Sequence, residues 1–413
     1  MKSNALPEGG KIKKISELII NQLSGFACAI DTMVERDGYV QLRPFNFGDN
    51  GRLKLDTLYQ IPIDQVDTNI YSLKKGDILF NNTNSIELVG KSLLVDKEYP
   101  FAFSNHINRL RVDTNSVIPA YFQYHLRYMW IKEHFAFNCK KWIGQAGYTV
   151  NKLAEQMIFL PSLENQQKIV EKLDNQMAQI ETMKKESEKQ KEISNNLRDS
   201  FLIEMYQKYS IFLTSFDEFI SESCNGFGER PNGVEAGPIV LRIADVSSGQ
   251  VDYSNARRGN VAWELQQKYK LNSDDLIFIR VNGSMDFIGK CILFNDEINE
   301  PVLFNDHLIR IRVNDEFIPE FVKIWCETPF IRRYMADKAS TSAGQLTINR
   351  SVLNEMPIPK VDKSIQKIVI EYYKRLNSEF KQLNSMIYFQ FNAINQLPAS
   401  ILNEVFGQYQ INS

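Results

Sequence analysis

The sequence predicts an α+β protein in which two similar globular segments of mixed strands and helices are separated by two long antiparallel helices that form a coiled coil. The first observation behind this prediction is an internal repeat with a period of about 199 residues. The second is that each copy opens with an aromatic-rich segment of roughly 150 residues and closes with a long run that carries one apolar stripe. A chain of 413 residues is also too long for one ordinary core.

Composition places the chain among ordinary globular proteins. Hydrophobic residues make up 43%, charged residues 24%, and the formal net charge is −2, which excludes a disordered, collagenous or membrane-embedded chain. No apolar run approaches the ~18–20 residues needed to span a bilayer. The first fourteen residues lack the apolar stretch of a secretory signal, and the five cysteines form no CxxC pair. We therefore expect a cytoplasmic protein without a zinc ribbon or a disulfide scaffold.

Six short motifs recur in the same order in both halves of the chain, at offsets of 198 to 201 residues. They include Leu42-Arg43 and Leu241-Arg242, His106-x-x-Arg109-x-Arg111 and His307-x-x-Arg310-x-Arg312, Gly144-Gln145 and Gly344-Gln345, Thr149-Val150-Asn151 and Thr347-Ile348-Asn349, and Gln167-Lys168-Ile169-Val170 and Gln366-Lys367-Ile368-Val369. No single match is specific, but their collinearity is hard to obtain by chance. The sequence therefore predicts an internal duplication.

Short apolar runs within the globular segments predict strands, for example at residues 77–80 and 308–313. The second run alternates apolar residues with arginine, so we expect one buried face and one face that shows Arg310 and Arg312. Each globular segment ends at a proline-bearing stretch, around Pro161 and around Pro357, which disfavours helix just upstream.

A long helix is predicted after each proline-bearing stretch. Residues 163–206 contain neither glycine nor proline, and apolar residues recur at steps of three and four there and again from Ser364 onward. Runs of this length, roughly 60 Å or more at ~1.5 Å per residue, are typical of coiled coils. The two stripes are natural antiparallel partners; the alternative is that each helix packs only on its own domain. Pro398 is expected to kink or break the second helix.

Two similar heads held on a stiff rod suit a linear polymer, and duplex DNA is the obvious candidate. The charge distribution supports this only in part. Residues 1–162 have a net charge of +3, whereas residues 209–359 have a net charge of −6, which is poor for unaided phosphate binding. We expect the second head to use the clusters Arg257-Arg258 and Arg332-Arg333, together with phosphate contacts from partner subunits.

The whole chain resembles the specificity subunit of type I restriction-modification systems. The resemblance rests on the Leu-Arg elements, on Gly76-Asp77-Ile78-Leu79-Phe80, on the late Gly-Gln elements, and on the Pro-x-Pro or Leu-Pro exit into a helix that opens with Gln-Lys-Ile. The second copy departs at Asn272-Ser273-Asp274-Asp275, where it lacks the glycine that Gly76 supplies. The resemblance implies target-recognition domains at residues 1–161 and 209–359 and conserved long helices at residues 162–208 and 360–413.

The resemblance also implies a role without catalysis. Such a subunit recognises an interrupted double-stranded DNA target, one half-site per domain. It docks two modification subunits, which methylate adenine, and restriction subunits with motor and nuclease activity. S-adenosylmethionine, ATP and magnesium are then expected on those partners, and no cofactor, metal or catalytic residue is expected on this chain.

Motifs for other functions are weak. Gly90-Lys91-Ser92 resembles the end of a phosphate-binding loop, but position 85 is serine instead of the required glycine, so a turn is the better interpretation. No HExxH motif and no His/Cys cluster with metal-ligand spacing occurs. Two alternatives stay open: a two-headed coiled-coil scaffold with no DNA role, and an enzyme with an unrecognised nuclease site in one head.

Base reading favours Arg, Lys, Asn and Gln on loops that a rigid scaffold positions. Three places per head qualify: the Leu-Arg element, the residues after the Asp77 and Asp275 strands, and the polar segment before the exit. The predicted DNA-binding residues are Arg43, Asn46, Asn82, Asn84, Lys140, Lys141, Gln145 and Tyr148 in the first head, and Arg242, Arg280, Asn282, Ser284, Thr341, Ser342 and Gln345 in the second. Asn282-Gly283 is also a turn signal, so a purely structural role is the alternative there.

Overall fold

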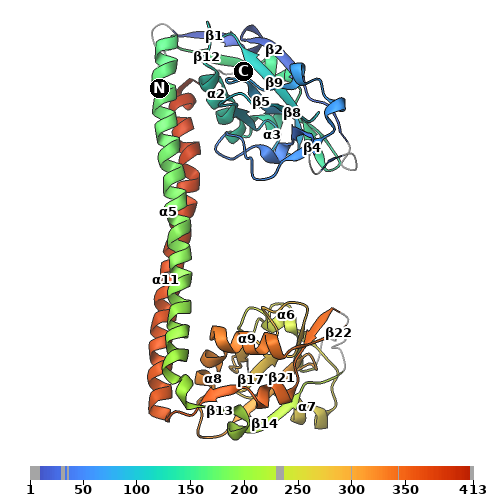
Figure 1. Ribbon diagram of the computed structural model, residues 1–413, viewed down its shortest axis with the longest axis vertical. Helices are drawn as coiled ribbons and strands as arrows, with labels where there is room; N and C mark the ends of the chain where they lie inside the picture. The colour runs from blue at the N-terminus through green and yellow to red at the C-terminus, as the bar shows by residue number, and fades with distance from the viewer. Residues whose placement is uncertain are drawn as a thin grey trace. The chain divides into compact units, whose positions relative to one another are not determined.

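The computed structural model describes residues 10–28, 33–34, 37–228, 237–298, 300–342 and 344–409. The chain divides into two compact units (Figure 1). Unit 1 comprises Met1–Ser187 and Phe389–Ser413, and unit 2 comprises Glu188–Tyr388. Each unit therefore contains one globular segment together with part of each long helix.

Unit 1 contains twelve strands among its described residues. They are β1 (Lys11–Lys14), β2 (Ile19–Ser24), β3 (Tyr39–Leu42), β4 (Tyr59–Ile61), β5 (Ile78–Asn81), β6 (Thr83–Asn84), β7 (Ser92–Leu94), β8 (Phe101–Phe103), β9 (Ile107–Val112), β10 (Lys140–Trp142), β11 (Gln145–Gly147) and β12 (Met157–Leu160). Its helices are α1 (Thr68–Tyr71), α2 (Pro119–Ile131), α3 (His134–Asn138), α4 (Val150–Ala154) and the first part of α5 (Leu163–Tyr209).

Unit 2 repeats this order. Its strands are β13 (Leu213–Ser215), β14 (Ile220–Asn225), β15 (Ile239–Leu241), β16 (Arg257–Arg258), β17 (Leu276–Ile279), β18 (Val281–Asn282), β19 (Cys291–Leu293), β20 (Val302–Phe304), β21 (Leu308–Val313), β22 (Ser340–Ser342), β23 (Gln345–Thr347) and β24 (Pro357–Pro359). Its helices are α6 (Ile243–Val246), α7 (Trp263–Tyr269), α8 (Pro319–Cys326), α9 (Pro329–Lys338), α10 (Arg350–Asn354) and most of α11 (Lys363–Phe406).

The sheets of the two units share one topology, which confirms the predicted duplication. A four-stranded sheet of order β2-β9-β5-β7 in unit 1 corresponds to β14-β21-β17-β19 in unit 2. The three-stranded sheets β4-β3-β8 and β10-β11-β6 correspond to β16-β15-β20 and β18-β23-β22. In both units a parallel pair, β3 with β8 and β15 with β20, lies among antiparallel ones.

The four-stranded sheet is buried on both faces, which explains why the inner strands β5 and β17 are almost entirely apolar. In β5, Ile78 and Phe80 face a core shared with α2, whereas Leu79 faces a second core with Leu42 and Phe103. Successive residues of a strand point to opposite faces, so one strand supplies both cores. The same division holds for β17 in unit 2.

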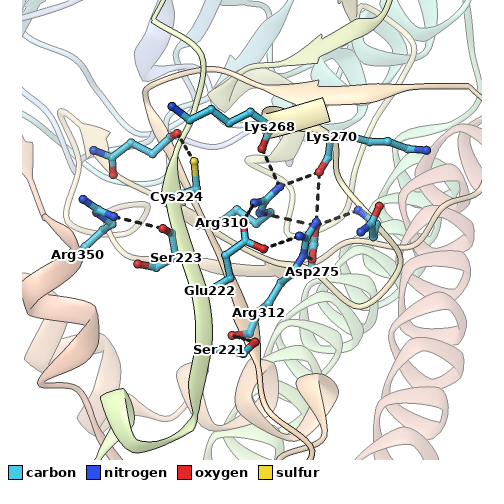
Figure 2. A network of polar contacts seen from close by, with 12 residues as sticks. Ser221, Glu222, Ser223, Cys224, Lys268, Lys270, Asp275, Arg310, Arg312 and Arg350 are labelled. Atoms are coloured by element: carbon cyan, nitrogen blue, oxygen red, sulfur yellow. Dashed lines mark hydrogen bonds and ion pairs between the residues drawn. The ribbon is translucent and has the colours of Figure 1, made fainter. Parts of the chain in front are cut away.

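The expectation that one face of residues 308–313 shows both arginines is wrong for Arg310. Strand β21 lies inside the sheet between β14 and β17, and Arg310 is only 1% exposed. Its guanidinium donates to the carbonyl oxygens of Lys268 (3.3 Å) and Lys270 (2.7 Å) and forms an ion pair with Glu222. Figure 2 shows these contacts. The alternation of the sequence reflects an ion-pair network in which Arg310 and Asp275 are buried while Arg312 and Glu222 stay partly exposed.

Buried Gln166 and Gln366 make the same contacts at the start of the two long helices. Gln166 Nε2 donates to the carbonyls of Ser116 (3.2 Å) and Pro161 (2.9 Å), and its Oε1 accepts from the backbone N–H of Ile118 (2.9 Å). Gln366 bonds Glu316, Val361 and Ile318 in the same way. The structural offset is therefore 200, and the sequence match of Gln167 with Gln366 is one residue out of register. The identity of the neighbouring residues had aligned the exposed Gln167 with the buried Gln366.

This register gives a testable expectation. Gln166→Ala should lower the free energy of unfolding by about 1–3 kcal/mol, because it leaves buried backbone groups without partners. Gln167→Ala is the matched control: Gln167 is exposed and bonds only Glu171 (2.9 Å), so its loss should change stability by no more than about 0.5 kcal/mol. Urea denaturation of both variants measures the difference, and equal destabilisation would contradict the 200-residue register.

The two long helices pack antiparallel, as predicted. In unit 1 the start of α5, around Leu173, shares a core with the end of α11, around Leu402, and Lys172 lies 3.1 Å from Glu404. In unit 2 the end of α5, around Met205, packs on the start of α11, around Ile370. Both ends also pack against the globular segment of their unit. Pro398 was expected to kink or break the second helix; it does not break it, because α11 continues through it to Phe406, and the kink stays a prediction.

His125 on α2 links the globular segment of unit 1 to the end of α11. Its ring packs edge-on against Phe406, with 5.3 Å between centroids. Burial, with a smaller contribution from His134, lowers the pKa of His125 to about 4. A histidine with a depressed native pKa stabilises the fold fully above its unfolded pKa near 6.5, and this stabilisation is lost as the pH falls towards 4.

We expect this histidine to account for about 3 kcal/mol of acid destabilisation between pH 7 and pH 4. His125→Phe keeps an aromatic ring beside Phe406 but removes the titration. The difference in unfolding free energy between pH 7 and pH 4 should therefore be smaller in the variant than in the wild type. Denaturant unfolding at a series of pH values measures it, and an unchanged pH dependence would contradict the role of His125.

Candidate DNA-recognition surface

In unit 1 a β-hairpin brings together predicted residues from two distant parts of the sequence. Strands β10 and β11 pair Lys140 with Gly147 and Trp142 with Gln145, and β11 also pairs with β6 through Asn84. Gly144 forms the turn with φ +74°, a conformation that side chains rarely adopt. The predicted residues Lys140, Lys141 and Gln145 are exposed along this hairpin, and Asn84 lies half-buried beside it.

A polar hollow of about 420 Å³ lies on one side of this hairpin. Alternation along β10 directs Lys140 and Trp142 to it and leaves Lys141 on the other side. The other side chains that line it are those of Gln22, Ser24, Asn82, Thr83, Asn108, Tyr148, Thr149, Val150 and Asn151. The sequence prediction missed Gln22, Ser24, Asn108 and Asn151. Only the antiparallel pairing of β2 with β9 brings the first three to the hairpin, and a single sequence carries no signal for that pairing.

Two of the predicted residues form the wall of this hollow and do not project from it. Asn82 Nδ2 donates to the carbonyl of Asn105 (3.2 Å), and its Oδ1 accepts from the Thr83 hydroxyl (2.7 Å). Tyr148 is 1% exposed, and its hydroxyl lies 3.4 Å from His134 Nε2. Burial raises the pKa of Tyr148 to about 12, so the hydroxyl stays neutral.

Unit 2 presents the equivalent hairpin with different side chains. Strand β23 pairs Leu346 with Thr341 of β22 and with Asn282 of β18, and Gln345 pairs with Ser342. Thr341 and Gln345 are exposed; the side chain of Ser342 lies outside the described part. Asn282 is half-buried, and its Oδ1 accepts from the backbone N–H of Ser284 (2.9 Å). The structural role suggested by the Asn-Gly turn signal is therefore present.

Arg280 stands where unit 1 has Asn82. Its backbone N–H donates to the carbonyl of His307 (2.8 Å) and its carbonyl accepts from Ile348 (3.0 Å). Asn82 makes the corresponding bonds with His106 and Tyr148, so the match of Thr149 with Thr347 is also shifted: the structural offset there is 200. One Arg280 nitrogen donates to the carbonyl of Asp306 (2.9 Å) and holds the side chain beside the hairpin.

The Leu-Arg elements belong to another sheet and do not join the hairpins. Asn46 is 1% exposed, and its Nδ2 donates to the carbonyls of Lys54 (2.9 Å) and Thr57 (2.8 Å). Arg43 donates to the carbonyl of Cys28 (3.0 Å). Arg242 binds Asp245 through two nitrogens, at 3.0 and 2.8 Å. These side chains stabilise their loops, and we leave them out of the proposed DNA surface.

The arginine clusters expected to bind phosphate in unit 2 are largely used within the fold. Arg258 pairs with Glu300 (2.6 Å), and Arg333 pairs with Asp337 (3.6 Å). Arg332 donates to the carbonyls of Met285, Asp286 and Ile288 at 2.9–3.2 Å. The positive charge left for DNA on this unit is therefore smaller than its arginine count indicates.

No group of three or more metal-ligating side chains lies together in the part of the chain that the structure describes. Within the same residues no helix combines the length and the hydropathy of a membrane span. Lys91 of the Gly-Lys-Ser motif is buried and donates to the carbonyl of Phe47 (2.9 Å) and to Asp49 (2.5 Å). It anchors a turn, as the sequence interpretation had it.

Comparison with known proteins finds one matching family model and several similar proteins. A family model for the type I restriction modification DNA specificity domain matches residues 50–192. The EcoKI specificity subunit of Escherichia coli K12 is 25% identical and covers 98% of this chain and 90% of its own length. The StySPI specificity subunit of Salmonella potsdam is 26% identical and covers 90% of this chain and 82% of its own length.

Solved structures share the fold. A chain from a structural study of complex assembly in a type I restriction-modification system superposes with a TM-score of 0.72 at 13% identity and covers 97% of this chain and 98% of its own. The specificity subunit of Thermoanaerobacter tengcongensis superposes with a TM-score of 0.59 at 13% identity and covers 98% of both chains. With the duplicated fold, these matches show that residues 50–192 carry a type I restriction modification DNA specificity domain and that the chain is similar over nearly its whole length to specificity subunits of type I restriction-modification systems.

Proposed function

We propose that this subunit recognises an interrupted DNA target of two half-sites, one read by each unit. The observation that carries the proposal is that equivalent hairpins have different side chains in the two units. The outer strand is Lys140-Lys141-Trp142 in unit 1 and Ser340-Thr341-Ser342 in unit 2. Since base edges are read by hydrogen-bonding side chains on a rigid scaffold, different hairpins should read different sequences.

Unit 1 has the more suitable surface for unaided DNA binding. Lys140 and Lys141 are exposed and make no ion pair among the described residues, so both are available for phosphate or base contacts. Unit 2 uses much of its positive charge internally. The proposal therefore assigns most phosphate contacts at the second half-site to partner subunits.

The proposal places two modification subunits on the long helices. In unit 2 these helices expose apolar side chains that their own packing does not use, including Ile193, Leu197, Ile368 and Met386. Exposed apolar stripes are typical of surfaces that a partner covers. The modification subunits would supply S-adenosylmethionine, and restriction subunits would supply ATP and magnesium, in the cytoplasm.

Co-expression with the cognate modification subunit in a methylation-free host tests this function. Mapping N6-methyladenine across the genome should reveal one interrupted motif that appears only when this chain is present. The required control is the same modification subunit, shown to be active with another specificity chain. If that control methylates and this chain adds no motif, the two-headed scaffold without a DNA role becomes the better account.

A further inference from the structure

The hairpin turn of unit 1 displays a large apolar side chain that the fold does not use. Ile143 is 102% exposed, and no large apolar side chain among the described residues is more exposed. Turns favour glycine, proline, asparagine, aspartate and serine, and a β-branched apolar residue has no local reason to stand there. The turn geometry depends instead on Gly144, whose φ is +74°.

The side chain of Trp142 connects the two strands next to the turn that carries Ile143. Trp142 Nε1 donates to the side-chain oxygen of Gln145 across the turn, at 3.2 Å. The indole ring lies over Gly147: a Cβ built on that glycine would stand 2.6 Å from the ring edge. Trp142 therefore packs within the hairpin and does not project from it as Ile143 does. Ile143 stands on a turn whose two strands are joined by this side-chain hydrogen bond.

The surroundings of Ile143 match the chemistry of DNA. Lys140 and Lys141 are exposed within three residues of it, on opposite sides of the same strand. Apolar side chains flanked by basic residues can enter a base step, unstack it and kink the duplex, while the basic groups hold the phosphates. A solvent-exposed isoleucine that follows two exposed lysines suits this use better than it suits a protein interface, whose core is depleted of charge.

Unit 2 has no counterpart. Its hairpin turn follows Ser342 with an alanine outside the described residues and then with Gly344, whose φ is +77°. Nothing the size of isoleucine stands there in the sequence. Any distortion caused by such a side chain should therefore be confined to the half-site of unit 1.

We propose that Ile143 is a wedge that inserts between adjacent base pairs of the half-site bound by unit 1, an inference that rests on the proposed recognition function. The insertion makes that half-site selective for a step that unstacks easily, such as a pyrimidine–purine step, without a hydrogen bond to its bases. Specificity then has two components in unit 1, direct reading by the hairpin and deformability at the wedge.

The test uses the full chain assembled with its modification subunits and duplexes that contain the mapped target. One 2-aminopurine replaces a base at each successive position. Binding should raise the emission several-fold at one step of one half-site, and Ile143→Ala should abolish that rise. Phe137→Ala is the matched control, because Phe137 is an exposed apolar residue (76%) beside the same hairpin but not on its turn. It should leave the rise intact. Any emission from adenines flipped for methylation should persist in both variants.

A second measurement compares the affinity for duplexes with and without a mismatch, because a mismatched step is already partly unstacked. A mismatch placed at the wedge step should strengthen binding of the wild-type complex by about tenfold, or about 1.4 kcal/mol, because it removes part of the cost of unstacking that step. The complex with Ile143→Ala should gain less than about twofold, because it has no wedge to benefit. The variant should assemble normally with its modification subunits, as sedimentation can verify.

The outcomes separate the two proposals. Sequence-specific binding without an Ile143-dependent emission change would overturn the wedge and leave the recognition function standing. An equal loss from Phe137→Ala, or failed assembly of the Ile143→Ala complex, would show that this surface binds protein instead. Absence of any sequence-specific binding would overturn the recognition function, and the wedge with it.

Discussion

Arg310→Met is expected to lower the free energy of unfolding of unit 2 by about 3–5 kcal/mol, the cost of breaking a buried ion pair by removing one partner. Arg310 is 1% exposed, and its guanidinium lies 4.0 Å from the carboxylate of Asp275, which is 2% exposed, and also pairs with Glu222. The carbonyl of Lys268 loses this donor as well, and the carbonyl of Lys270 keeps only the longer bond from Arg312, at 3.3 Å. Methionine fills the stem volume but replaces none of these charges.

The matched control is Arg350→Met, which removes an exposed arginine of the same unit that makes one bond of 3.2 Å to the carbonyl of Ser223. Figure 2 shows both arginines. Urea unfolding followed by tryptophan fluorescence compares the variants, and the control should stay within about 0.5 kcal/mol of the wild type. If Arg310→Met behaved like the control, the buried network would be a consequence of the fold and not a support of it. The repeat-equivalent Arg109, which donates to Ile70 (2.8 Å) and Ser72 (3.2 Å), should behave like Arg310.

Arg280→Ala is expected to reduce discrimination at one half-site by about 1–3 kcal/mol and to leave assembly intact. Arg280 emerges beside the hairpin of unit 2, and a single bond to the carbonyl of Asp306 orients it without consuming its remaining donors. An arginine that reads a guanine edge through two nitrogens contributes an amount of this size. Competition binding with targets substituted at each position of both half-sites measures the effect.

The pattern of losses distinguishes base reading from phosphate binding. Relaxed preference at one position of one half-site supports base reading by Arg280. A uniform loss on all sequences, with a smaller dependence on salt, would mean that Arg280 touches only phosphate.

Several features could be predicted from the sequence because they depend on local pattern. The apolar stripes of α5 and α11 predicted their antiparallel pairing, because an exposed apolar stripe of that length requires a partner helix. The repeated motifs indicated two copies of one fold, and the glycines of the hairpin turns, Gly144 and Gly344, were located correctly beside Gln145 and Gln345. Three of the predicted residues in unit 1, Lys140, Lys141 and Gln145, are exposed on one hairpin.

Other features could not be predicted from the sequence, because they depend on contacts between segments that are far apart in the chain. Arg310 and Asn46 look like surface residues by type, but neighbouring strands and loops enclose both. The glutamine register failed for a related reason. The Lys-Ile-Val that follows Gln167 also follows Gln366, so the sequence aligns these two glutamines. The residue that shares the burial and the hydrogen bonds of Gln366 is Gln166, and only the folded structure shows this.

The sequence by itself determined the duplication and the long helices, and it predicted the types of residue that would contact DNA, because these features follow from periodicity and composition. The tertiary structure alone decided which of those residues share a surface. Antiparallel pairing of β2 with β9, and of β6 with β11, brings Gln22, Asn108 and Asn84 to the hairpin from three separate segments. Strand pairing between distant segments follows from the packing of the whole domain, so it cannot be predicted from a local sequence pattern.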